Sequence, residues 1–149
     1  MESILLAMDE SENALRAVRY VGRIIGSARK NFQVTMVHVL VRPSPDLFEE
    51  PGGAQKYEQE QRRKIEAVFE KAKGLFQEAG VAAEAVQGKF IVTDEPGIAQ
   101  GLLAEQRAGH YGTLVVGRRG VTKAEEFLFG SVSNKIIHHA KDCAVWVVE

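Results

Sequence analysis

Short apolar runs alternate with longer amphipathic segments from one end of the chain to the other. Five runs with the character of buried strands lie at residues 3–8, 32–40, 81–87, 113–116 and 143–148. Between them, apolar residues recur at helical spacing, which predicts helices after residues 9–12 and over residues 56–79, 94–109 and 131–140. Strands joined in this order by right-handed helical crossovers form an open parallel sheet with helices on both faces. The chain is therefore predicted to be a single α/β domain over residues 1–149.

Size, charge and cysteine content exclude several classes of protein. The chain has 149 residues, of which 45% are hydrophobic and 26% charged, as expected for one globular domain. Its net charge of -1 argues against the broad basic surface of a non-specific nucleic-acid-binding protein. No apolar run approaches the roughly 20 residues that cross a bilayer, and the first residues lack a signal-peptide pattern. The single cysteine, Cys143, suits a reducing compartment, so a cytoplasmic location without a membrane partner is expected.

Two connections are expected to lack regular structure. Residues 41–55 contain three of the four prolines and the pair Gly52-Gly53, which predicts an exposed, mobile loop. The charged outer side of the helix that follows is interpreted as a solvated face. Residues 88–95 are expected to connect the third strand to the next helix.

The residues that follow the first and fourth strands are the expected ligand site. In an open parallel sheet, ligands bind beyond the carboxyl ends of the strands, where the strand order reverses. We expect that reversal between the first and fourth strands, which end at Met8-Asp9 and at Val116-Gly117. Two glycine-containing stretches follow the fourth strand, Gly117-Arg118-Arg119-Gly120 and Gly130-Ser131-Val132-Ser133.

These two stretches have the chemistry of a phosphate site. Gly117 and Gly120 allow the backbone to approach a ligand closely. The second stretch opens a helix whose first N–H groups have no intrahelical partner and suit a phosphate. The arginines add positive charge, and Asp9 can accept hydrogen bonds from a ribose. The alternative is that these glycines and serines only end a strand and begin a helix. Their spacing alone does not decide between this interpretation and a phosphate site.

The spacing of these residues resembles the ATP-binding branch of the universal stress protein (UspA) family. That branch has a Gly-x2-Gly-x9-Gly-Ser/Thr signature, which is present here as Gly117, Gly120, Gly130 and Ser131, with Ser133 at a further hydroxyl position. Asp9 followed by Ser11-Glu12, and His38-Val39 at the end of the second strand, also match. The resemblance covers essentially the whole chain.

The resemblance implies a Rossmann-like five-stranded sheet of order 3-2-1-4-5, with ATP, ADP or AMP at the switch point. It places the adenine near Ala7, Met8 and Val39, the ribose near Asp9, and the phosphates at the two glycine-containing stretches. The expected nucleotide-binding residues are Ala7, Met8, Asp9, Val39, Val116, Gly117, Arg118, Arg119, Gly120, Gly130, Ser131, Val132 and Ser133. No metal site made by protein side chains alone is expected, and the resemblance implies Mg²⁺ or Mn²⁺ bound with the phosphates.

The last strand is expected to form a homodimer. Its residues, Ala144, Val145, Trp146, Val147 and Val148, would leave a long apolar sheet edge exposed, which is an aggregation hazard unless it is paired or covered. We predict that it pairs antiparallel with its twofold copy, as the resemblance also implies, with Trp146 in the dimer core. The alternative is that Trp146 packs only against a helix of its own chain.

The sequence favours a stress-response protein in which the nucleotide is a regulatory ligand that changes a surface read by a protein partner. No hydrolytic base is evident, so at most slow turnover is expected. Two alternatives remain open at this point, a dimeric interaction module without nucleotide and a slow ATP hydrolase or phosphotransferase.

Overall fold

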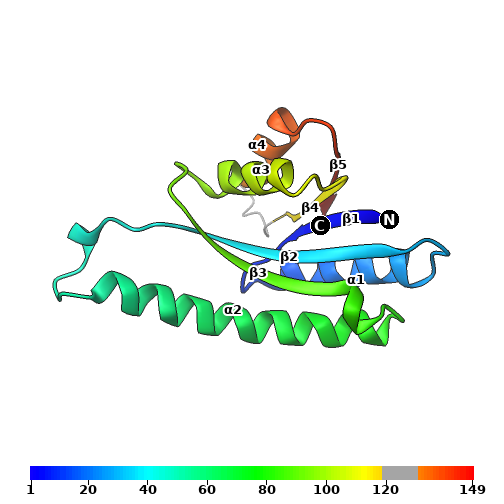
Figure 1. Cartoon of the computed structure of the whole chain (residues 1–149), viewed down its shortest axis with the longest axis horizontal. Coiled ribbons are helices and arrows are strands. Elements are labelled where there is room, and N and C mark those ends of the chain that lie inside the picture. The colour runs from blue at the N-terminus through cyan, green and yellow to red at the C-terminus, as the bar shows by residue number, and fades with distance from the viewer. Residues whose placement is uncertain (119–130) are drawn as a thin grey trace.

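The central sheet has five strands in the order β3-β2-β1-β4-β5 in the computed structural model, which describes residues 1–118 and 131–149 (Figure 1). All four neighbouring pairs are parallel, so β1 lies between β2 and β4. The strands are β1 (Glu2–Ala7), β2 (Phe32–Val41), β3 (Val86–Thr93), β4 (Thr113–Gly117) and β5 (Ala144–Val148). The predicted fold class and strand order are confirmed.

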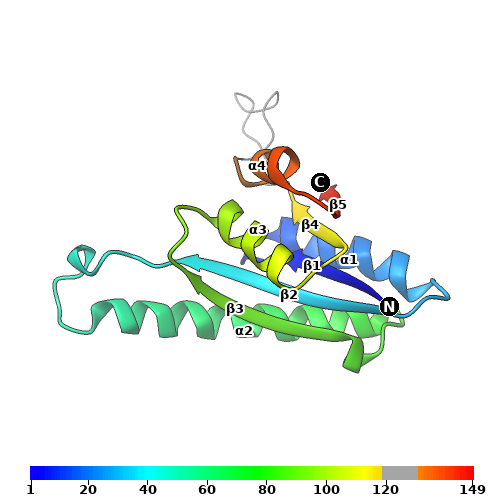
Figure 2. The ribbon, with the colours of Figure 1, turned by 45° about the horizontal axis from the view of Figure 1, so that its top comes forward.

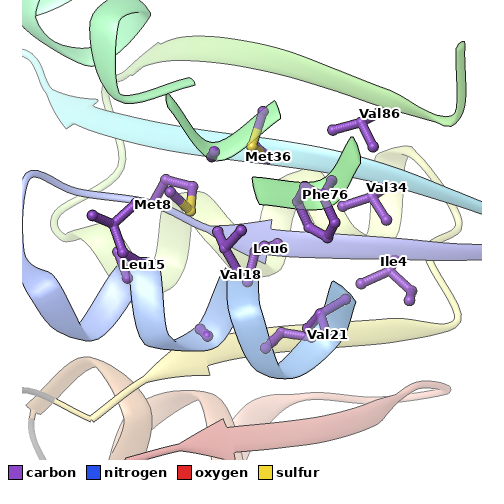
Figure 3. Close-up of a cluster of buried hydrophobic side chains, with 14 of the residues drawn as sticks. Ile4, Leu6, Met8, Leu15, Val18, Val21, Val34, Met36, Phe76 and Val86 are labelled. Carbon is purple, nitrogen blue, oxygen red and sulfur yellow. The ribbon is translucent and has the colours of Figure 1, made fainter. Parts of the chain in front are cut away.

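Two pairs of helices cover the two faces of this sheet. They are α1 (Glu12–Gly26), α2 (Gly53–Glu78), α3 (Ile98–Ala108) and α4 (Ser131–His139). The alternation of side chains along β1 separates the core into two clusters: Ile4 and Leu6 pack with α1 and α2, and Leu5 packs with α3 and α4. Figure 3 shows the first cluster, where Phe76 of α2 lies beside side chains of the sheet and α1. Figure 2 shows the second pair of helices on the opposite face of the sheet.

The connection between β2 and α2 is shorter and more ordered than predicted. β2 extends to Val41, a short 3-10 helix (η1) spans Pro45–Leu47, and α2 begins at Gly53 rather than at residue 56. Gly52 precedes the helix with φ +80°, a conformation that favours glycine. The predicted exposed loop is therefore confirmed over residues 42–52, but it is shorter at both ends than predicted and contains a hydrogen-bonded 3-10 turn.

The third strand was predicted in the wrong place. It spans Val86–Thr93, not residues 81–87, and residues 88–93 are strand rather than connection. Val81 is buried, but it anchors the exit from α2, and a 3-10 turn (η2) at Ala83–Ala85 precedes the strand. Gly88 is required by packing, because an added Cβ there would lie 2.5 Å from the ring of Phe69. After β3, α3 begins at Ile98, four residues later than predicted.

No helix in the parts of the chain that the structure describes is both long enough and apolar enough to cross a membrane.

Candidate functional site

A cavity of about 250 Å³ lies where β1, β2 and β4 end and where α1, α3 and α4 begin. Its lining residues come from all six of these elements or the turns beside them. They are Ala7, Met8, Asp9, Ser11, Asn13, Ala14, Val37, His38, Val39, Ile98, Leu102, Val116, Gly117, Ser131 and Val132. The cavity therefore occupies the point at which the strand order reverses, between β1 and its neighbour β4.

Asp9 and Ser11 organise the turn between β1 and α1. The backbone N–H of Ser11 donates to Asp9 Oδ1 at 2.8 Å, and the Ser11 hydroxyl donates to the same oxygen. Ser11 is also the N-cap of α1, since its hydroxyl oxygen accepts from the N–H of Ala14 at 3.3 Å. This network holds the Asp9 carboxylate at the cavity wall, next to the first turn of the helix.

Gly117 allows the end of β4 to approach the first turn of α1. A Cβ added at Gly117 would lie 3.2 Å from the carbonyl oxygen of Asn13 and 3.3 Å from its carbonyl carbon. These neighbours are backbone atoms, which cannot rotate away as a side chain can. Glycine at this position therefore sets the width of the cavity on the β4 side.

His38 is a cavity residue with a defined tautomer. Its Nδ1 lies 2.8 Å from the carbonyl oxygen of Met8, and because a carbonyl only accepts, Nδ1 carries the hydrogen. In the neutral ring, Nε2 is then an acceptor. The ring packs against Phe90 with a centroid distance of 5.4 Å, and the guanidinium of Arg62 lies 4.4 Å from the Phe90 centroid. His38 thus joins the ends of β1 and β2.

The cavity wall has an apolar part and a polar part. Val39, Ile98 and Leu102 represent the apolar side, contributed by β2 and α3. Asp9 and Ser131 represent the polar side, and Ser131 is the first residue of α4, where backbone N–H groups have no intrahelical acceptor. An apolar wall with a few convergent polar groups suits a ligand that has a flat apolar body and an anionic end.

The structure brings most of the predicted site residues together around the same cavity. Eight of them line the cavity: Ala7, Met8, Asp9, Val39, Val116, Gly117, Ser131 and Val132. Two others do not line it. The N–H of Arg118 donates to the carbonyl oxygen of Val148 at 2.7 Å, and its Nη1 lies 3.7 Å from a carboxylate oxygen of Glu149. Ser133 is 2% exposed within α4. Arg119, Gly120 and Gly130 lie outside the described residues.

Seven lining residues were not predicted as site residues. They are Ser11, Asn13, Ala14, Val37, His38, Ile98 and Leu102. Ser11 has a sequence signal, since serine is a favoured N-cap residue directly before an amphipathic helix. Ile98 and Leu102 are one turn apart on α3, within the helix predicted over residues 94–109, but their spacing did not indicate that this face borders the cavity. Among the described residues, no three His, Cys, Asp or Glu side chains form a group that could hold a metal ion.

Trp146 packs inward in the structure. Its ring meets Tyr20 of α1 edge-to-face, with centroids 6.3 Å apart and planes at 88°. Val145 and Val147 point to the opposite face, where they pack against the cluster beneath α3 and α4. Val145, Trp146 and Val147 are therefore partly buried within the chain, whereas Ala144 is exposed. In the described part of the chain, no strand lies beside the outer edge of β5.

The chain is a doubly wound α/β protein with a cavity at the switch point of its parallel sheet, the position at which proteins of this architecture bind ligands. A model of the Universal stress protein family matches residues 1–149, and the chain belongs to that family. Comparison with curated proteins found no match.

Three solved structures illustrate the likeness in fold. A universal stress protein in complex with cAMP is 22% identical, with a TM-score of 0.74 and coverage of 99% of this chain and 97% of that one. UspA from Lactobacillus plantarum is 16% identical, with a TM-score of 0.75 and coverage of 99% and 97%. An Archaeoglobus fulgidus universal stress protein in complex with dAMP is 17% identical, with a TM-score of 0.69 and coverage of 100% and 98%.

Proposed function

We propose that this protein binds an adenine nucleotide, ATP or its products ADP and AMP, in the cavity at the ends of β1 and β4. The observation that carries the proposal is the convergence, on one cavity, of an apolar wall and the first turn of α4. The apolar side chains of β2 and α3 suit the adenine ring, and the first N–H groups of α4, which have no acceptor within the helix, suit a phosphate. Two structures of similar fold are of universal stress proteins in complex with cAMP or dAMP, which supports an adenine ligand.

Individual residues have distinct roles in this proposal. Ala7, Met8 and Val39 contact the base, and the Asp9 carboxylate accepts from the ribose. Ser131 and Val132 present the backbone of α4 to the phosphates, together with Gly120 and Gly130 of the same signature, and Arg119 adds positive charge. Mg²⁺ or Mn²⁺ is bound through the phosphates. Arg118 and Ser133 do not line the cavity, so they contribute to the site indirectly, by supporting residues that do.

The nucleotide acts as a regulatory ligand in the stress response of the cytoplasm. The described part of the cavity has one carboxylate, Asp9, and that carboxylate already accepts from the N–H and hydroxyl of Ser11. A group held in this way is suited to binding rather than to deprotonating water. Nucleotide occupancy then changes the surface around α4 that a protein partner recognises.

Thermal unfolding with and without millimolar ATP, ADP, AMP and cAMP tests the proposal. A ligand at a hundredfold excess over its dissociation constant stabilises the folded state by about 2.7 kcal/mol. For a chain of this size we expect the melting temperature to rise by ~5–10 °C. Inorganic tripolyphosphate is the control for charge alone and should give a much smaller rise. If none of the four nucleotides raises the melting temperature, the protein is an interaction module without nucleotide.

We also propose that β5 pairs antiparallel with β5 of a second copy. The N–H of Ala144 donates to Gly112 and the carbonyl of Val148 accepts from Arg118, so these two residues direct their backbone groups toward the β4 side. Alternation along a strand then directs the N–H and C=O groups of Val145 and Val147 to the open edge. Those groups are available to a partner strand.

Val147→Pro is expected to convert the dimer into a monomer, as measured by sedimentation equilibrium. Proline removes an N–H that faces the open edge and leaves the hydrogen bonds to β4 in place. Val147→Ala is the matched control, because it removes the same side chain and keeps the N–H, and it should remain dimeric. Val145→Pro provides the same test at the second outward position. Dimerisation of both proline variants at wild-type strength rules out edge pairing.

A further inference from the structure

The outer face of α1 is strongly basic although the chain is nearly neutral. The exposed cations of α1 and the turn after it are Arg16, Arg19, Arg23, Arg29 and Lys30. No acidic residue occurs between Glu12 and Asp46. These five cations contribute +5 to a chain of net charge -1, so the remainder of the chain carries -6. None of the five forms an ion pair with a carboxylate in the part of the chain that the structure describes.

Two exposed apolar side chains lie on the same face of α1. Tyr20 is 40% exposed and Ile24 is 38% exposed. Residues 16, 19, 20, 23 and 24 recur at three- and four-residue spacing and so form one surface. We call this surface, together with Arg29 in the turn after the helix, the α1 basic face. Arg16 donates to Asn13 at 2.7 Å, and the guanidinium of Arg23 lies 5.9 Å from the centroid of the Tyr20 ring. Since no carboxylate among the described residues pairs with these arginines, they can pair with carboxylates from another molecule, and the two apolar side chains can contact an apolar group.

The segment between β2 and α2 has the opposite character. Residues 43–52, here called the β2–α2 arm, carry Asp46, Glu49 and Glu50, and no cation occurs between Arg42 and Lys56. All three carboxylates are exposed, and within residues 1–118 and 131–149 the single ion pair formed by any of them is a 3.7 Å contact between Glu50 and Lys56. Leu47 lies among them and is 75% exposed. The arm is therefore an acidic surface with one prominent apolar side chain.

The arm has a defined conformation that keeps Leu47 outward. The N–H of Leu47 donates to Ser44 at 3.1 Å, and the N–H of Phe48 donates to Pro45 at 3.2 Å. Phe48 turns toward α2, where its ring centroid lies 5.8 Å from that of Tyr57. A Cβ added at Gly53 would lie 2.8 Å from Cβ of Phe48, so the aromatic side chain is closely held. An apolar side chain that remains exposed on an ordered segment is suited to a partner surface.

The arm and the end of α1 lie at opposite ends of the molecule. Figures 1 and 2 both show the β2–α2 arm extending beyond the sheet at one end of the long axis, and the turn after α1 at the other. The two surfaces therefore cannot meet within one chain. Two copies arranged side by side and antiparallel bring each arm to the α1 of the other.

The two surfaces also match in length. Arg16 to Ile24 spans eight residues of helix, about 12 Å along its axis. Asp46 to Glu50 spans four residue steps, which is at most about 14 Å and less here because Asp46 and Leu47 lie in η1, so the arm fits within the length of the face. Three carboxylates can therefore face the arginines of α1 while Leu47 lies between Tyr20 and Ile24.

We propose that the β2–α2 arm of one copy docks on the α1 basic face of a second copy. Asp46, Glu49 and Glu50 pair with the arginines, and Leu47 packs on Tyr20 and Ile24. The contact is isologous, because each copy supplies one arm and one basic face. It uses neither the nucleotide cavity nor the β5 edge, so it forms whether or not those proposals hold.

Charge reversal on both surfaces tests this contact. The α1 variant carries Arg19→Glu, Arg23→Glu and Arg29→Glu; Arg16 is left unchanged because it donates to Asn13, a cavity residue. The arm variant carries Asp46→Lys, Glu49→Lys and Glu50→Lys. A third chain carries all six substitutions and has the same net charge as the wild type. Each chain is made with Val147→Pro and also with wild-type β5, and association constants are measured by sedimentation equilibrium.

The control is a triple variant with the same change in net charge at other exposed lysines. Lys64→Glu, Lys71→Glu and Lys135→Glu lie on α2 and α4, and none of these lysines forms an ion pair in the described structure. This variant reports what general repulsion between copies does to association. Circular dichroism of each variant establishes that it is folded.

We expect the α1 and arm variants each to weaken association about tenfold or more, since exposed ion pairs are individually weak but three are reversed. The association constant of the chain with all six substitutions should return to within about threefold of the wild-type value, because opposite charges face each other again. Salt should weaken the wild-type contact, whereas β5 pairing through backbone groups should be little affected. The contact does not exist if the chain with all six substitutions fails to recover its association constant. The same conclusion holds if the association constant of the lysine control falls as far as that of the α1 variant.

Discussion

Gly26→Ala is expected to destabilise the protein by about 3 kcal/mol or more. An added Cβ at Gly26 would overlap the carbonyl oxygen of Ala79 and lie 3.0 Å from its carbonyl carbon. Both neighbours are backbone atoms at the end of α2, so relief requires the two helices to move apart. Moving them would disturb Phe76, which is fully buried in the cluster that α1 and α2 share with the sheet (Figure 3).

Gly74→Ala is the matched control for Gly26→Ala. Gly74 also lies within a helix, but an added Cβ would meet no atom within 4 Å. Alanine is favoured over glycine in a helix by about 0.5–1 kcal/mol, so this variant should be slightly more stable than the wild type. Urea unfolding of both variants gives the comparison. A free energy of unfolding for Gly26→Ala equal to that of Gly74→Ala would show that α1 and α2 do not cross as closely as the structure indicates.

The interior strands could be predicted from sequence because burial on both faces leaves a continuous apolar signal. In β1, residues Ile4, Leu5 and Leu6 are all buried, and each is apolar whichever face it meets. β4 has the same property over Leu114–Val116. The alternation of such strands with amphipathic helices then limits the fold to a few topologies, of which the family resemblance selects one.

The third strand could not be predicted in the same way because it lies at the edge of the sheet. Gln87, Gly88 and Lys89 are exposed in its first half, so the apolar signal is interrupted where the strand begins. Lys89 instead forms an ion pair of 2.6 Å with Glu105 of α3. Five of the six residues at positions 81–86 are apolar, which resembles a strand, but Val81 is buried for a different reason, the return of the chain from α2.

Part of the candidate site depends on contacts between residues far apart in sequence. The glycine and serine spacing after β4 indicated where a ligand site would form, and Gly117 and Ser131 do line the cavity. The orientation of Arg118 depends on Val148 and Glu149, thirty residues later in the chain, and no local pattern contains that information. His38 reaches the site through a hydrogen bond to the Met8 carbonyl, which is likewise a product of strand pairing.

Ser131→Glu is expected to separate stability from nucleotide binding. Ser131 is exposed, lines the cavity and begins α4, so a carboxylate here lies at the positive end of the helix dipole. That placement should leave the free energy of unfolding unchanged or raise it by about 0.3–1 kcal/mol. The same carboxylate should repel a phosphate bound by the first turn of α4. We expect the affinity for ATP to fall by at least about tenfold, since like charges a few ångströms apart repel by several kcal/mol near a protein surface.

The matched control is Ser131→Gln, because glutamine has nearly the shape of glutamate without its charge. The ATP affinity of this variant should be within about threefold of the wild-type affinity. Calorimetric titration with ATP, AMP and adenosine then locates the repulsion. If phosphates meet the start of α4, the loss caused by the carboxylate should be largest for ATP, smaller for AMP and negligible for adenosine. An equal loss for all three ligands would mean that residue 131 excludes the base by bulk, and the glutamine variant would show the same loss. A carboxylate that leaves all three affinities unchanged would place the phosphates away from α4 and contradict the proposed orientation of the nucleotide.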